Sequence, residues 1–122
     1  MSSTVRALRG ATTLDVDTPE EMNERVQALV REMMARNDIA NDDIISVIFT
    51  ATEDLTSTFP ATAARSVGLG DVPLLCAREL SVAGGTPRCV RVLMHVTTEA
   101  ARSELRHVYL EDAKGLRDDL PG

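Results

Sequence analysis

The chain has 122 residues, which is enough for one domain, 1–122, with a core of its own; 43% of them are apolar. Its net charge of −6 argues against nucleic acid as a partner, because phosphate recognition depends on Lys and Arg. The isolated cysteines Cys76 and Cys89 predict neither a zinc site nor a disulfide framework. We therefore expect a reduced, cytoplasmic protein without a signal peptide or a membrane span.

Arginine dominates the basic residues, since Lys114 is the single lysine beside twelve arginines. Arginine suits bidentate binding of carboxylates, which favours an anionic small molecule as the ligand. A GC-rich genome would produce the same bias through its codons. The positions of the arginines must therefore decide between the two explanations.

The first half of the chain predicts a strand, a helix and a second strand. Residues 4–10 alternate apolar and charged side chains and predict a short strand. Thr18 as N-cap, Pro19 at the first helical position and Glu21 as partner in a capping box predict a helix that ends near residue 36. Residues 44–51 are mostly β-branched and apolar, as in a central strand covered on both faces. The helix should bury one face, consisting of Met22, Val26, Leu29, Val30 and Met33.

The second half predicts a short helical segment over 60–70 and strands over 71–80, 88–97 and 106–110. A polar, mobile tail is expected over 111–122. This order of elements indicates the α+β class: a single mixed sheet of about five strands with helices on one face. No further layer remains to cover the other face, which makes a neighbouring subunit a plausible cover.

Gly84-Gly85 predicts a hairpin between the strands over 71–80 and 88–97. Glu79 and Arg91 would then face each other as a cross-strand ion pair. Cys76 lies three residues before Glu79, and a regular strand therefore turns the two side chains to opposite faces.

Several segments, taken together, resemble the monofunctional trimeric α/β-class chorismate mutases. They occur in the family's order and span most of the chain. They are RGATT at 9–13, FPA with a later arginine at 59–65, VP…C…E at 72–79, GG…CVRV at 84–92, RHVYL at 106–110 and LR…DL at 116–120.

The resemblance implies conversion of chorismate to prephenate by an intramolecular rearrangement that needs no cofactor and no metal. Such an enzyme must hold a flexible dianion in its reactive conformer and stabilise the negative charge that grows on the ether oxygen. Guanidinium groups suit both tasks. The family implies a homotrimer, a pseudo-α/β-barrel with active sites between subunits, in which Cys76 and Glu79 serve different clefts.

The resemblance also assigns roles to individual residues. Arg91 matches the arginine at the ether oxygen, and Arg9, assisted by Tyr109, matches a binder of a substrate carboxylate. Glu79 and Cys76 match the groups that meet the ring hydroxyl. Arg91, Glu79 and Arg9 form the expected catalytic set. The apolar and backbone wall matches Phe59, Ala61, Leu74 and Leu75; Arg65 and Arg117 match charge-supplying or closing positions, and Thr62 stands where the family often has a lysine.

Each of these residues has a purely structural interpretation: an ion pair, a strand end, or a small buried thiol. His95 and His107 are expected to be structural or surface residues. Two other functions remain open. One is a trimeric imine-deaminating or small-molecule-binding protein of similar architecture; the other is an interaction module whose Arg–Glu pairs only fix subunit register.

Overall fold

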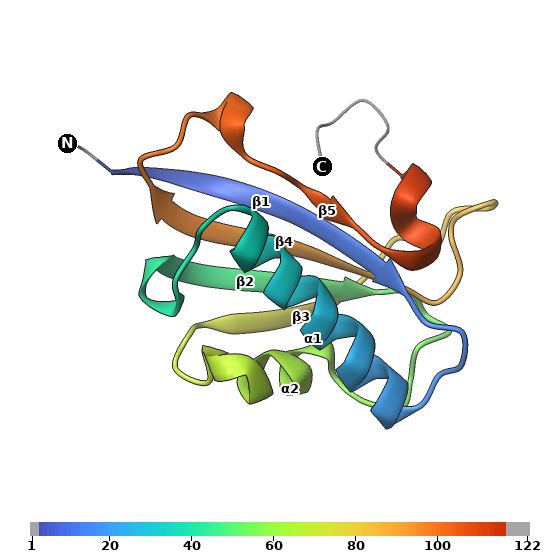
Figure 1. The fold of residues 1–122 in the computed structure, drawn as a ribbon. Helices are drawn as coiled ribbons and strands as arrows, with labels where there is room; N and C mark the ends of the chain where they lie inside the picture. Colours follow the sequence, from blue (N-terminus) through green and yellow to red (C-terminus); the bar gives the residue numbers. More distant parts are fainter. Residues whose placement is uncertain (1–2, 117–122) are drawn as a thin grey trace.

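The computed structural model describes residues 3–116, and within this part of the chain five strands form one mixed sheet (Figure 1). The spatial order is β3-β2-β4-β1-β5. β4 is antiparallel to both β1 and β2, whereas β3 runs parallel to β2 and β5 runs parallel to β1. The strands are β1 (Thr4–Thr13), β2 (Ile44–Ala51), β3 (Leu74–Arg78), β4 (Cys89–Thr98) and β5 (Val108–Tyr109).

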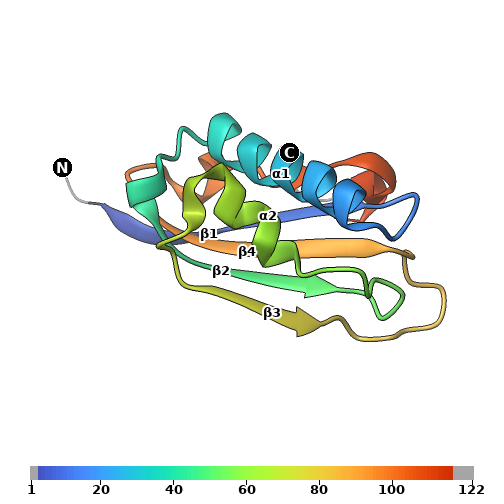
Figure 2. The ribbon, with the colours of Figure 1, turned by 90° about the horizontal axis from the view of Figure 1, so that it is seen from below.

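Both α-helices cover the same face of this sheet (Figure 2). They are α1 (Pro19–Arg36) and α2 (Pro60–Ala64), which continues into η2 (Arg65–Leu69). The other helical elements of the described residues are short 3₁₀ turns: η1 (Asn41–Asp43), η3 (Arg102–Glu104) and η4 (Glu111–Gly115). The predicted α+β class with helices on one face is confirmed. No helix among the described residues is long and apolar enough to cross a membrane.

The start of α1 follows the sequence signals with one difference. The Thr18 hydroxyl accepts a hydrogen bond from the backbone N–H of Glu21 (3.2 Å), and Pro19 occupies the first turn. The Glu21 carboxylate accepts instead from the backbone N–H groups of Asp15 and Val16, not from Thr18 as in the predicted capping box. Glu21 therefore fixes the loop that enters the helix.

The core lies between α1, α2 and the sheet. The predicted apolar stripe of α1 is confirmed, since all five of its members are fully buried. Gly10 of β1 allows the helix to approach closely, because a Cβ at this position would lie 2.5 Å from the sulfur of Met33. Val90, Val92, Met94 and Val96 of β4 are buried on the same side of the sheet.

Three segments differ from the sequence expectations. β1 continues three residues past Gly10, because Ala11–Thr13 keep their pairing with β4. The predicted hairpin around Gly84-Gly85 is wrong: β2 lies between β3 and β4, and the glycines sit in a longer loop between them. Residues 111–115, expected in a mobile tail, form η4 with Ala113 buried.

Arg25 connects η4 to the start of α1. Its side chain is 15% exposed and donates to the carbonyl oxygen of Thr13 (2.6 Å). It also forms ion pairs with Asp15 and Glu21, both at 3.1 Å, and with Glu111 at 3.7 Å. This network holds the end of β1, the helix entry and the turn after β5 together, and it therefore helps to position Tyr109 of β5.

Asp17 anchors the loop that leads from β2 to α2, and its replacement by Asn tests this role. Its carboxylate accepts from the backbone N–H and hydroxyl of Thr56 and the backbone N–H of Ser57, and these bonds, chiefly that from the Thr56 N–H, lower the pKa of Asp17. We expect Asp17→Asn to reduce the free energy of unfolding by about 1 kcal/mol at pH 7.

The dependence on pH has a defined sign. Because the folded-state pKa lies below the unfolded value of about 4, the stabilisation is complete above that value and is lost as pH falls through the folded pKa. Urea unfolding at several pH values should therefore find wild type and Asp17→Asn converging in acid. Asp71→Asn, at an exposed aspartate, is the control. A gap that persisted unchanged in acid would contradict the role of the carboxylate charge.

Candidate active site

A pocket of about 340 Å³ lies on the face of the sheet that the helices leave uncovered. The strand register brings its side chains together, since Ala11 and Thr50 both pair with Arg91, and Arg9 and Ile48 both pair with Leu93. We call it the candidate active-site pocket. Its lining consists of Arg9, Gly10, Ala11, Ile48, Thr50, Glu79, Arg91, Val92, Leu93 and Tyr109.

Glu79 and Arg91 form the predicted ion pair in this pocket, with 3.3 Å between Glu79 Oε2 and Arg91 Nε. Their geometry differs from the prediction, because the two residues are not on paired strands. Glu79 follows the end of β3, where its backbone N–H donates to the carbonyl of Ala51 (3.0 Å). Its side chain reaches past Thr50, the residue of β2 that separates it from Arg91.

The Glu79 carboxylate is held on both oxygens. Thr50 Oγ1 donates to Oε2 at 2.9 Å, and the backbone N–H of Leu80 donates to Oε1 at 3.0 Å. The ion pair uses Nε of Arg91, and the outer amino groups of this guanidinium can therefore contact a ligand. The result is a fixed cation on a strand in the middle of the sheet.

Cys89 lies on the same face as Arg91 but is buried. Burial raises the pKa of its thiol, and the charge of Arg91 offsets this effect only in part. The thiol is therefore neutral at physiological pH and is a poor nucleophile. In the described residues, no group of three or more His, Cys, Asp or Glu is arranged to hold a metal ion.

Arg9 supplies a second cation to the pocket from β1. Its side chain is exposed, and no carboxylate of residues 3–116 lies within ion-pair distance of it. The backbone N–H of Arg9 donates to Nδ1 of His107 (3.0 Å), which fixes the strand beside β5. Two guanidinium groups, one clamped and one unpaired, thus line a single pocket with an apolar floor, an arrangement suited to a small carboxylate ligand.

Tyr109 lines the same pocket from β5. Its ring packs against a small apolar cluster that includes Ala11, Cys89 and Ala113. Its phenol oxygen is inaccessible to solvent and has no hydrogen-bond partner among residues 3–116. A buried hydroxyl without a partner costs stability and is therefore a candidate for contact with a ligand.

Phe59 and Cys76 line a different pocket, of about 490 Å³, near α2 and the end of β3. Cys76 pairs with Phe49, which faces the helices, whereas Glu79 contacts Thr50 on the opposite face. The predicted separation of Cys76 and Glu79 is therefore confirmed. No described residue lines both pockets. Within one chain, the predicted site residues therefore fall into two groups: Arg9, Glu79, Arg91 and Tyr109 line the candidate active-site pocket, and Phe59 and Cys76 line the other pocket.

The remaining predicted residues either line neither of these two pockets or lie outside the described chain. Leu75 is 61% exposed on the uncovered face, whereas Leu74 turns towards the helices. Ala61 is buried, Thr62 is half-buried and Arg65 is exposed, all on α2 or the turn that follows it. Arg117 lies outside the described residues.

Thr50 and Ile48 were not predicted to belong to the site. The run at 44–51 was interpreted as covered on both faces because it is so apolar. Its polar members share one parity, however: Ser46 and Thr50 alternate with the buried Val47 and Phe49. That alternation was the signal for a face without helices.

The chain matches known proteins over nearly its whole length. The family model for chorismate mutase type I matches residues 5–120. The chorismate mutase AroH of Thermus thermophilus is 48% identical over 117 residues, which cover 95% of this chain and 96% of that protein. AroH of Bacillus subtilis strain 168 is 39% identical over 117 residues, or 95% and 92% of the two chains.

A solved structure agrees with this match. A chorismate mutase from Clostridium thermocellum superposes with a TM-score of 0.88 at 45% identity and covers 89% of this chain and 97% of its own. The fold and the sequence therefore define an α+β isomerase. The chain belongs to the chorismate mutase type I family.

Tyr109→Phe tests the unpartnered phenol oxygen. Removal of a buried hydroxyl without a hydrogen bond should change the free energy of unfolding by no more than about 0.5 kcal/mol, or raise it. Thr13→Val is the comparison, since it removes the acceptor of the Asp112 backbone N–H (3.1 Å) and should cost about 1 kcal/mol. Urea unfolding at a fixed protein concentration measures both. Equal losses would mean that the phenol has a partner within the fold.

Proposed function

We propose that the candidate active-site pocket converts chorismate to prephenate by an intramolecular rearrangement. The observation that carries this proposal is the Arg91 guanidinium clamped by Glu79 beside Arg9, in a chain of the chorismate mutase type I family. One bond between carbon and the ether oxygen breaks while a carbon–carbon bond forms. Because both changes occur within one molecule, the residues must bind, orient and stabilise charge, and no cofactor is required.

Arg91 is assigned to the ether oxygen. Negative charge grows on this atom as its bond to carbon breaks, and a cation at that point stabilises the transition state more than the substrate. Glu79 acts with Thr50 to keep the guanidinium in place before substrate arrives. Its carboxylate is also assigned to the ring hydroxyl of the substrate.

Arg9 and Tyr109 are assigned to a substrate carboxylate. Arg9 is free of carboxylate partners in residues 3–116, and the phenol of Tyr109 has a hydrogen to donate. Together they would hold the dianion in the compact conformer in which its two ends can react. Arg65 and Arg117 supply further positive charge, and Thr62 stands where other members of the family often have lysine.

The complete site requires a second copy of the chain, and we propose a homotrimer. Each chain carries both halves of the proposed site, but in separate pockets. The charged half, with Arg9, Glu79 and Arg91, lies in one pocket, and the half with Phe59 and Cys76 lies in the other. Large apolar side chains are left exposed, such as Leu75 on the uncovered face and Phe59, which is 70% exposed. Three sheets packed with their uncovered faces inward, as a pseudo-α/β-barrel, would join the halves.

Two features of the wider setting complete the proposal. Both cysteines are free and lie on opposite sides of the sheet, in keeping with a reduced cytoplasmic enzyme. Leu74, Leu75 and Ala61 would supply the apolar and backbone wall for the substrate ring, with the backbone or thiol of Cys76 beside it.

Arg91→Ala tests the proposal directly. Turnover of chorismate, followed by its ultraviolet absorbance, should fall by about 10³-fold or more in kcat, because a neutral methyl group cannot stabilise the ether oxygen. Arg31→Ala, at an exposed arginine of α1 outside the pocket, should keep full activity. Circular dichroism and sedimentation should find both variants folded and assembled as wild type.

Other outcomes have distinct meanings. Turnover that survived Arg91→Ala would contradict the role of this residue. Wild-type protein that was inert on chorismate but active on imino acids would contradict the proposed reaction. If Arg91→Ala disrupted assembly while the protein that still assembled kept its activity, the ion pair of Arg91 with Glu79 would have a structural role only.

A further inference from the structure

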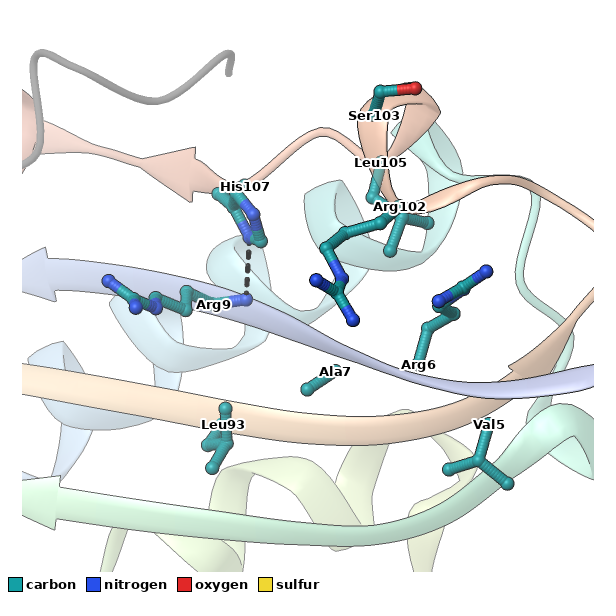
Figure 3. Close-up of a pocket in the computed structure, with 9 residues that line it drawn as sticks. All are labelled: Val5, Arg6, Ala7, Arg9, Leu93, Arg102, Ser103, Leu105 and His107. Carbon is teal, nitrogen blue, oxygen red and sulfur yellow. Dashed lines mark hydrogen bonds between the residues drawn. The ribbon is translucent and has the colours of Figure 1, made fainter.

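A third pocket, of about 830 Å³, lies at the edge of β1 (Figure 3). β5 pairs only with Gly10 and Ala11, and the segment 102–107 therefore runs beside the earlier part of β1 without strand pairing. The space between them is the edge pocket. Its lining consists of Val5, Arg6, Ala7, Arg9, Leu93, Arg102, Ser103, Leu105 and His107.

Three guanidinium groups reach this pocket from two segments. Arg6 and Arg9 come from β1 and Arg102 comes from η3, and in Figure 3 the side chains of Arg6 and Arg102 lie on the same side of β1. No carboxylate of residues 3–116 lies within ion-pair distance of any of the three. The Nε atom of Arg6 is inaccessible to solvent and has no hydrogen-bond partner within the described part of the chain. In a chain of net charge −6, such a cluster without counter-ions is suited to an anion.

Apart from Ser103 and His107, the rest of the lining is apolar. Val5, Ala7 and Leu93 form one wall, and Leu105, which is buried, lies across from them. A bare inorganic anion would leave these side chains in contact with water. A ring or short carbon chain would cover them while its carboxylates meet the guanidinium groups.

We propose that the edge pocket binds a small organic anion with an apolar body and one or two carboxylates, and that its occupant competes with substrate for Arg9. The second half of this proposal rests on the proposed function. Arg9 lines both the edge pocket and the candidate active-site pocket, and its side chain is exposed. When this guanidinium binds a carboxylate in the edge pocket, it is lost to the substrate, and substrate binding weakens.

The cationic half of the edge pocket lies apart from the surface proposed for subunit contacts. Val5, Ala7 and Leu93 share the uncovered face of the sheet with Arg91. Arg6 alternates with Val5 and Ala7 along β1, and Arg102 approaches from the 102–107 segment (Figure 3). The proposal therefore requires that a neighbouring subunit leave both this end of the apolar wall and the arginines accessible at the edge of the sheet.

The test uses isophthalate, a benzene ring with two carboxylates, on the full-length assembled protein. Titration followed by amide resonances should find saturable shifts at Arg102 and Ser103. Isophthalate should also inhibit chorismate turnover. In Arg102→Gln the binding and the inhibition should weaken about tenfold, the effect of losing one charge-assisted hydrogen bond. The KM for chorismate without isophthalate should not change, because Arg102 lines no part of the candidate active-site pocket.

Matched controls define the site and the ligand. Arg106→Gln removes a nearby exposed arginine that does not line the pocket, and it should bind isophthalate as wild type does. Isophthalamide, the neutral isostere, and inorganic phosphate should bind at least tenfold more weakly. Phosphate that bound as tightly as isophthalate would overturn the inferred ligand class.

Two further results would overturn the site itself. The first is the absence of saturable shifts at Arg102 and Ser103, as would occur if another subunit filled the pocket. The second is equal inhibition of wild type and Arg102→Gln, which would place isophthalate in the active site alone. The titration followed by amide resonances measures binding of isophthalate and does not depend on chorismate turnover. Binding without turnover would contradict only the proposed function, and turnover without binding would contradict only the edge pocket.

Discussion

The ion pair between Glu79 and Arg91 is the interaction on which the candidate active site depends. Such a pair contributes at most about 1 kcal/mol to stability where it is partly exposed, and the Arg91 side chain is 47% exposed. Its importance is positional. Thr50 and the backbone of Leu80 fix the carboxylate, and the carboxylate fixes a cation in the middle of a sheet face that would otherwise favour apolar side chains. Function accounts for these polar residues better than stability does.

The two faces of the sheet have different tasks. Towards α1, the face is apolar apart from the buried Thr12, and it is closely packed, to the point that Gly10 cannot carry a Cβ without a clash with Met33. The opposite face carries the charged pocket and exposed apolar side chains, and β3 at one edge and β1 near the other each carry part of the predicted site. The described residues form no further layer over this face. The site and the assembly are therefore best understood together.

The sequence predicted elements that local chemistry determines and missed those that depend on pairing. Thr18, Pro19 and the apolar stripe predicted α1 correctly, because capping and helical spacing act within a few residues. The hairpin at Gly84-Gly85 was wrong, because no local signal reveals that β2 inserts between β3 and β4. The Glu79–Arg91 pair is present although the hairpin from which it was predicted is wrong; the family resemblance had placed both residues in the site independently of the hairpin. Thr50, which completes the pair, became apparent only from the sheet order.

Subunit complementation measures the central claim most directly, namely that the Arg91 half and the Phe59 half of one site come from different chains. Arg91→Ala and Phe59→Asp, the latter placing a negative charge where the anionic substrate must bind, should each be inactive alone. Refolded together in equal amounts, the mixture as a whole should recover about a quarter of wild-type chorismate turnover, because random assembly leaves that share of all sites with both halves intact. Mixtures that assembled into trimers but stayed as inactive as their parents would contradict the shared site.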